Sequence, residues 1–210
     1  MCHIYNYKLK SNNMETQEKT LSHTESLAII QNMIATAKNS ITDDGFHFML
    51  WGILVIAASL AQYLLAVVFN YAHNELPWMI MPAIGVPAAF LYEWRKKKHE
   101  QVKTHFDTIF GLLWAAVGIT IFCVIFISVK NGLSPIPFIL TITGLGTFVS
   151  GSILKFKPLT WGGPLFWVAA IGASYAAPIN QLLINGVAIF IGYIIPGILL
   201  WKNYKAETHV

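Results

Sequence analysis

Long apolar runs, almost free of charge, constrain this chain more than any other feature. Asp, Glu, Lys, Arg and His are absent from 108–129, from 131–154 and from 158–201. Apolar runs of about 18 or more residues predict transmembrane helices, because about 20 helical residues rise about 30 Å, the thickness of the hydrocarbon core. Charged residues make up only 11% of the chain, against about a quarter in soluble domains, so a soluble fold is not expected.

Six apolar spans follow a polar N-terminal segment. We expect them at about His47–Phe69, Pro77–Trp94, Thr108–Val129, Ile136–Leu154, Leu159–Ala177 and Gln181–Trp201. The predicted fold class is all-α: a polytopic membrane protein with six transmembrane helices preceded by a cytoplasmic amphipathic helix. The expected order is a disordered segment (1–23), the amphipathic helix (24–45), the six-helix bundle (46–202) and a short cytoplasmic tail (203–210). Residues 1–23 lack the apolar core of a secretory signal, and Met14 is an alternative start.

Basic residues near the span ends predict the orientation. If the N-terminus is inside, the same side carries Lys38, Arg95, Lys96, Lys97, Lys98, Lys103, Lys155, Lys157, Lys202 and Lys205. The other side then carries only Lys130. Because Lys and Arg favour the cytoplasmic side, we expect a multi-pass protein of the cell inner (plasma) membrane with both termini in the cytoplasm.

The basic stretch after the second span consists of Arg95, Lys96, Lys97 and Lys98. Its first expected role is to anchor the topology. Lys/Arg clusters beside a span also attract acidic lipids, so anionic headgroups are candidate partners besides the bilayer itself. Nucleic acid is not an expected partner, because this loop is short and lies against the bilayer.

Residues 24–45 carry an apolar stripe at helical spacing. Leu27, Ile30, Ile34 and Ile41 repeat at intervals of three, four and seven residues, which predicts one apolar face. Ser22 and Glu25 have the spacing of a capping box. Because the segment holds more acid than base, we expect the stripe to pack on protein, either its own bundle, a partner or a second copy, rather than on acidic lipid.

Two acidic residues, Asp43 and Asp44, precede the first span on the side of Arg95–Lys98. One hypothesis is an ion-pair latch between the two groups. The alternative is that both carboxylates are solvated at the helix junction. An exposed pair stabilises by only ~0–1 kcal/mol, so either arrangement has a small energetic effect.

The spans offer no convincing catalytic chemistry. Ser150 precedes Gly151 in "FVSGS", but the rhomboid protease pattern Gly-x-Ser-Gly has Phe148 in place of its first glycine. All seven histidines lie outside the last three spans, so a nucleophilic serine has no base there. Cys2 and Cys123 are far apart in sequence, and metal-ligand spacing is absent. We therefore expect no enzyme activity and no catalytic, cofactor or metal site.

Small residues and prolines predict how the spans pack. Gly146 with Ser150, and Thr147 with Gly151, recur every fourth residue in span four, as Ala169, Ala173 and Ala177 do in span five. Such spacing lets helices approach closely. Prolines interrupt span two, at Pro82 and Pro87, and span six, at Pro196, while span four is rich in glycine. The even-numbered spans are thus expected to be irregular. Trp114 and Trp167 are expected to pack between helices.

The stretches "MIATAKNSITDDGFHFMLWG", "SGSILKFKPL" and "YIIPG" resemble an uncharacterised family of small six-span bacterial membrane proteins. This resemblance implies no activity. Two functional hypotheses remain: a non-enzymatic interaction or regulatory membrane component, or a carrier or channel for a small neutral or lipophilic solute. A continuous polar path would favour the carrier; its candidate residues are Gln62, Thr141, Thr143, Asn185 and Tyr193.

Overall fold

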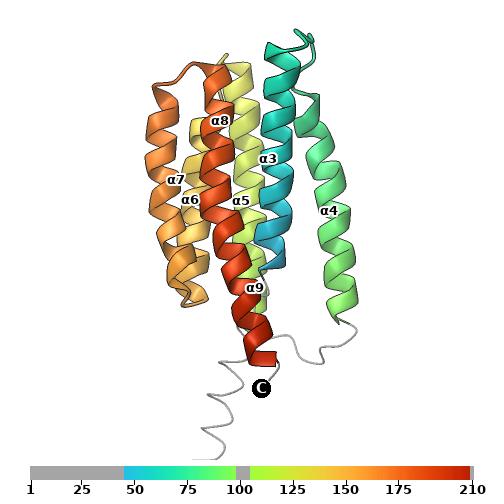
Figure 1. Ribbon diagram of the computed structural model, residues 1–210, viewed down its shortest axis with the longest axis vertical. Helices are drawn as coiled ribbons and strands as arrows, with labels where there is room; N and C mark the ends of the chain where they lie inside the picture. The colour runs from blue at the N-terminus through green and yellow to red at the C-terminus, as the bar shows by residue number, and fades with distance from the viewer. Residues whose placement is uncertain (1–44, 98–104, 209–210) are drawn as a thin grey trace, which may run out of the picture. The chain divides into compact units, whose positions relative to one another are not determined.

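The computed structural model describes residues 45–97 and 105–208, which form helices joined by turns (Figure 1). The elements are α3 (Phe46–Val67), α4 (Leu76–Lys97), α5 (His105–Lys130), α6 (Ile136–Ile153), α7 (Lys157–Ser174), α8 (Pro178–Ile189), the π-helical segment η1 (Phe190–Ile194) and α9 (Ile195–Thr208). Each of the first five predicted spans coincides with one helix, and α8, η1 and α9 share the sixth. The described residues contain no strand, which confirms the all-α class for them.

Five helical stretches are long and apolar enough to cross a membrane. They are Phe46–Val67, Leu76–Arg95, Thr108–Lys130, Ile136–Ile153 and Pro178–Lys205. The described part of the chain therefore has the architecture of a helical membrane protein. Helix α7 is not among the five, although it has 18 residues like α6. It begins with a lysine and contains adjacent glycines followed by Pro164, all of which lower its mean apolarity.

Parts of the predicted organisation lie outside the described residues. They include the disordered segment 1–23, the amphipathic helix up to residue 44, and Lys98. At the other end of the chain, α9 continues to Thr208, beyond the expected bundle boundary at residue 202.

Helices α3 and α6 organise the packing. Helix α3 contacts α4, α8, η1 and α9, while α6 contacts α5, α7 and α8. Within the described part of the chain, α4 has α3 as its only backbone neighbour, and it lies at one side of the helices in Figure 1. Most α4 side chains are therefore exposed to whatever surrounds the bundle, which agrees with their apolar character.

Glycine brings α6 and α7 almost into backbone contact. A Cβ atom added to Gly163 would lie 2.5 Å from Phe148 Cβ, and one added to Gly144 would lie 2.9 Å from the carbonyl oxygen of Gly163. A Cβ atom on Gly151 would overlap the backbone nitrogen of Thr160. These approaches confirm the predicted close packing of span four. In span five Ala173 is buried as expected, whereas Ala177 is exposed.

The last apolar span changes helix type before Pro196. Proline lacks an N–H and cannot donate to the carbonyl of Gly192, four residues earlier. The backbone forms the π-helical segment η1 at this point, in which the Ile195 N–H donates to the carbonyl of Phe190, five residues earlier. Gly192 also allows a close approach here, because a Cβ atom would lie 2.5 Å from the Phe166 ring. The predicted interruption near Pro196 is therefore confirmed.

The prediction that the even-numbered spans are the irregular ones is wrong. Helix α6, the fourth span, runs as one α-helix over Ile136–Ile153 despite its glycines, because those glycines pack against α5 and α7. Helix α7, the fifth span, contains Pro164 in its interior. Helix α4 stays a single helix through Pro82 and Pro87.

Candidate functional site

Tyr193, in η1, lies at the centre of an aromatic cluster. Its ring centroid is 5.5 Å from that of Phe48 on α3, 6.2 Å from Trp114 on α5 and 5.3 Å from Phe166 on α7, all edge to face. Such pairs are each worth about 0.5–1.5 kcal/mol beyond the area they bury. The Tyr193 cluster (Phe48, Trp114, Phe166 and Tyr193) therefore connects elements that are distant in sequence, and it confirms the interhelical packing of Trp114.

A short polar chain begins at the Tyr193 cluster. The Tyr193 side chain lies beside that of Thr147 on α6, and the Thr147 hydroxyl donates to the carbonyl oxygen of Thr143 at 2.7 Å. Ser150, one helical turn further along the same helix, is fully buried, and its Oγ has no hydrogen-bond partner among the described residues. The polar chain thus ends without reaching the surface.

A second buried polar contact joins α3 to α8. The Asn185 amide nitrogen donates to Ser59 Oγ at 3.0 Å, and both residues are at most 3% exposed. Near the start of α8, the buried Gln181 donates to the carbonyl oxygen of Ala176 at 3.1 Å. Its Oε1 has no partner within residues 45–97 and 105–208. Burial of these groups makes their hydrogen bonds costly to break.

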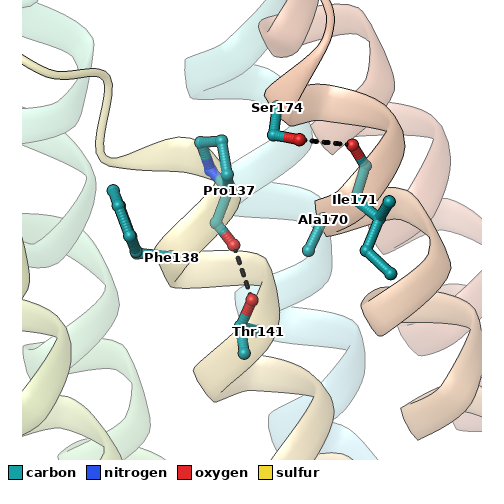
Figure 2. A pocket seen from close by; sticks show the side chains of 6 residues that line it. All are labelled: Pro137, Phe138, Thr141, Ala170, Ile171 and Ser174. Carbon is teal, nitrogen blue, oxygen red and sulfur yellow. Dashed lines mark hydrogen bonds between the residues drawn. The ribbon is translucent and has the colours of Figure 1, made fainter.

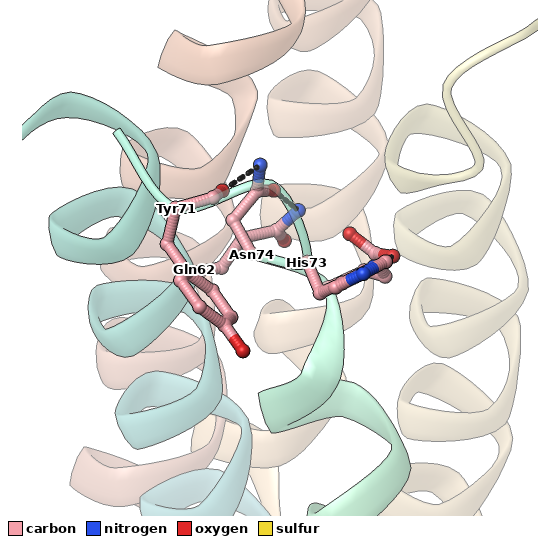
Figure 3. A network of polar contacts seen from close by, with 5 residues as sticks. Gln62, Tyr71, His73 and Asn74 are labelled. Atoms are coloured by element: carbon pink, nitrogen blue, oxygen red, sulfur yellow. Dashed lines mark hydrogen bonds and ion pairs between the residues drawn. The ribbon is translucent and has the colours of Figure 1, made fainter. Parts of the chain in front are cut away.

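A third polar group surrounds the turn between α3 and α4 (Figure 3). The Gln62 amide nitrogen donates to Asn74 Oδ1 at 3.1 Å, and the Trp78 indole N–H donates to Gln62 Oε1. Asn74 in turn donates to the carbonyl oxygen of Tyr71 at 3.4 Å. The neighbouring His73 lies 3.6 Å from Glu75, and both side chains are well exposed. These contacts stabilise the turn.

A shallow, open groove of about 190 Å³ lies between α6 and α7 (Figure 2). Its lining residues are Pro137, Phe138, Thr141, Ala170, Ile171 and Ser174. Both hydroxyl groups are already engaged: Thr141 donates to the carbonyl oxygen of Pro137 at 2.9 Å, and Ser174 donates to that of Ile171 at 2.7 Å. The groove therefore offers an occupant mainly apolar surface.

The five side chains proposed to line a solute path do not form one continuous group. Gln62 belongs to the α3–α4 turn, and Thr141 lies on the outer surface of α6. Asn185 bonds to Ser59, while Thr143 and Tyr193 are connected only through Thr147. Their contacts are local, and the buried Ser150 Oγ and Gln181 Oε1 have no partner among the described residues.

The clearest interhelical pair involving ionisable groups joins the first turn of α3 to the end of α4. His47 Nε2 lies 2.9 Å from Glu93 Oε1, and their side chains are 31% and 42% exposed. Beside them the rings of Phe46 and Tyr92 stack, with centroids 3.7 Å apart and planes 12° apart. We call these four residues the α3–α4 clamp.

Most of the predicted interaction residues cannot be placed. Leu27, Ile30, Ile34, Ile41, Asp43, Asp44 and Lys98 lie outside the described residues, so the proposed acidic–basic latch stays a prediction. Arg95 is exposed near the end of α4, and Lys96 and Lys97 belong to that helix. No group of at least three His, Cys, Asp or Glu residues suited to a metal ion occurs in the described ranges.

Sequence reasoning did not predict the clamp. His47 begins the first predicted span and Glu93 lies beside the end of the second, so the predicted topology puts both on the cytoplasmic side, and that shared position was the available signal. The contact between Ser59 and Asn185 had no such signal, since 126 positions separate them in the chain.

Comparison with known protein families, with curated proteins and with solved structures finds no match to this chain.

Proposed function

We propose that this chain is a six-span integral membrane protein that acts without catalysis, as an interaction or regulatory component of the cell inner membrane. The observation that carries this proposal is that the polar side chains inside the bundle form separate local contacts and not one connected path. Tyr193, Asn185 and Gln62 each use their hydrogen-bonding capacity locally. A polar solute moving through the bundle would need such groups in a continuous series.

Six spans rather than five are proposed because α7 packs along α6. The approach of Gly144 to Gly163 holds the two helices together as an antiparallel hairpin of equal length. Buried Phe166 in α7 also contacts Tyr193. The remaining faces of α7 expose Trp161, Val168 and Ile171, large apolar side chains suited to a lipid environment.

The proposed partner is another protein or a second copy of the chain, engaged through the apolar stripe of residues 24–41. Burying a side chain such as Ile30 or Ile34 stabilises by about 1.5–3 kcal/mol, so the stripe gains from protein contact. The basic residues Arg95–Lys98 would bind anionic lipid headgroups on the same, cytoplasmic side of the membrane.

The experiment replaces Ile30 and Ile34 together by aspartate in the full-length protein. Amide exchange in detergent micelles and crosslinking in native membranes then compare this variant with wild type. We expect faster exchange over residues 26–41, together with loss of a crosslinked partner or dimer or a lower melting temperature. The matched control replaces Gln31 and Asn32 by alanine and should behave as wild type. Wild-type exchange as fast as that of a free peptide, with unchanged melting and crosslinks, would exclude this function.

A carrier or channel for a small neutral or lipophilic solute is the second candidate. The π-helical segment before Pro196 favours it, because π-helical turns and interrupted spans occur often at functional sites. Solute flux into vesicles containing the purified protein, above that of empty vesicles, would support this candidate over the first.

A further inference from the structure

Helix α4 is attached to the described bundle through α3 alone. At its N-terminal end, Trp78 donates to Gln62. In its middle, Gly85 is the buried residue, and a Cβ atom there would lie 2.9 Å from Leu54 Cδ1 and 3.0 Å from the Trp51 ring. At its C-terminal end, the α3–α4 clamp provides the attachment.

The clamp combines an apolar and a polar contact at adjacent positions. Phe46 stacks on Tyr92, and the next residues, His47 and Glu93, approach to 2.9 Å. The His47 ring also meets the Tyr92 ring edge-on, with centroids 6.0 Å apart. The stack and the polar contact act side by side, and only the strength of the polar contact depends on the charge of the histidine.

We propose that the contact between His47 and Glu93 is a proton-controlled latch that holds the C-terminal half of α4 against α3. Histidine changes charge between pH 5 and 8, and the partial exposure of His47 lets its ring exchange protons with water. Protonated His47 makes a charge-assisted hydrogen bond to the Glu93 carboxylate, whereas the neutral ring makes only a weaker one. The latch is therefore tight at acidic pH and loosens as the pH rises.

Other ionisable groups lie near this pair in the sequence. On α4, Glu93 is followed by Arg95, which is exposed, and then by Lys96 and Lys97. Of the elements packed on α3, α8 contributes no ionisable side chain and η1 contributes only the buried Tyr193. Helix α9 carries Lys202, Tyr204, Lys205 and Glu207; Lys205 lies 4.0 Å above the Trp201 ring.

Two further groups precede α3 in the sequence, Asp43 and Asp44, outside the described residues. Aspartate is ordinarily charged throughout this range, whereas His99 and His105, which follow α4 in the sequence, are histidines like His47, so the response is assigned by replacing His47 itself.

The two prolines of α4 make the middle of the helix easier to bend. Pro82 and Pro87 lie on either side of the buried Gly85, and each removes one backbone hydrogen bond from the helix. The part of α4 after Gly85 can then tilt about this residue when the contact between His47 and Glu93 is weak. The basic residues that begin at Arg95 move with it.

The test measures the distance between α4 and α9 in the full chain, held in lipid nanodiscs. Spin labels are placed at Leu91→Cys and Leu199→Cys, both at exposed positions, after Cys2→Ser and Cys123→Ser. We expect one narrow distance distribution at about pH 5.5, and a fraction of longer distances that rises about two- to fivefold at about pH 8, the range that one exposed ion pair can supply.

Charge-removing variants identify the group responsible. Glu93→Gln and His47→Gln retain a hydrogen-bonding side chain and should abolish the pH response. The control His73→Gln makes the same change at the exposed histidine beside Glu75 and should keep it. Identical wild-type distributions at both pH values would overturn the proposal without any variant. It would be overturned equally if the response survived in both clamp variants, or disappeared in the His73 control.

Discussion

The ring of Tyr193, in the π-helical segment η1, meets that of Phe166 on α7 edge to face with their centroids 5.3 Å apart, and the Tyr193 side chain lies beside Thr147 of α6. Tyr193 is 4% exposed and Thr147 is fully buried. Because η1 places one more residue in a helical turn than an α-helix does, it rotates the residues that follow relative to those that precede it. Tyr193 thereby contacts α3, α5 and α7 while its hydroxyl reaches α6.

Replacing Tyr193 by phenylalanine is predicted to destabilise the protein by about 1 kcal/mol, because the buried hydroxyl loses its polar contact with Thr147 while the ring contacts remain. Thermal unfolding of the purified protein in detergent micelles measures the change. Tyr175→Phe is the matched control, since Tyr175 is 89% exposed and should lose nothing. Equal stability of the two variants would show that the contact of the Tyr193 hydroxyl with Thr147 contributes nothing net.

Replacing Gly151 by alanine is predicted to destabilise the α6–α7 hairpin by about 1–3 kcal/mol, because the added methyl group meets the backbone of Thr160, which cannot move aside as a side chain can. The same denaturation assay measures the loss. The matched control is Gly118→Ala on α5, where no atom lies within 4 Å of the new methyl group. That control should be as stable as wild type or up to about 1 kcal/mol more stable, because alanine has a higher helix propensity than glycine. A Gly151→Ala protein as stable as the control would contradict the observed packing.

Reporter fusions are predicted to distinguish six spans from five. Fusions after Asn74, Asn131 and Asn180 should report the outside, and fusions after His99, Lys157 and Lys205 the inside, because the basic residues cluster at the second set. The decisive positions flank α7 and the last span. An inside signal at Asn180 together with an outside signal at Lys205 would mean that α7 does not cross the membrane.

The amino-acid sequence by itself determined where the helices are. Apolar runs bounded by basic or turn residues locate helices such as α3 and α6 to within a few positions, because burial of apolar surface and backbone hydrogen bonding are properties of each segment alone. The small residues Gly146 and Gly151 likewise predicted a close helix approach before any partner was known.

Only the tertiary structure decided which side chains meet. The pairing of Ser59 with Asn185, and of His47 with Glu93, depends on the rotation of each helix about its axis and on the relative shift between helices. An apolar span carries little information about either, since most of its faces are equally apolar. The π-helical segment shifts that rotation again before Pro196, so the place of Tyr193 between α3, α5, α6 and α7 follows from the folded backbone rather than from residue spacing.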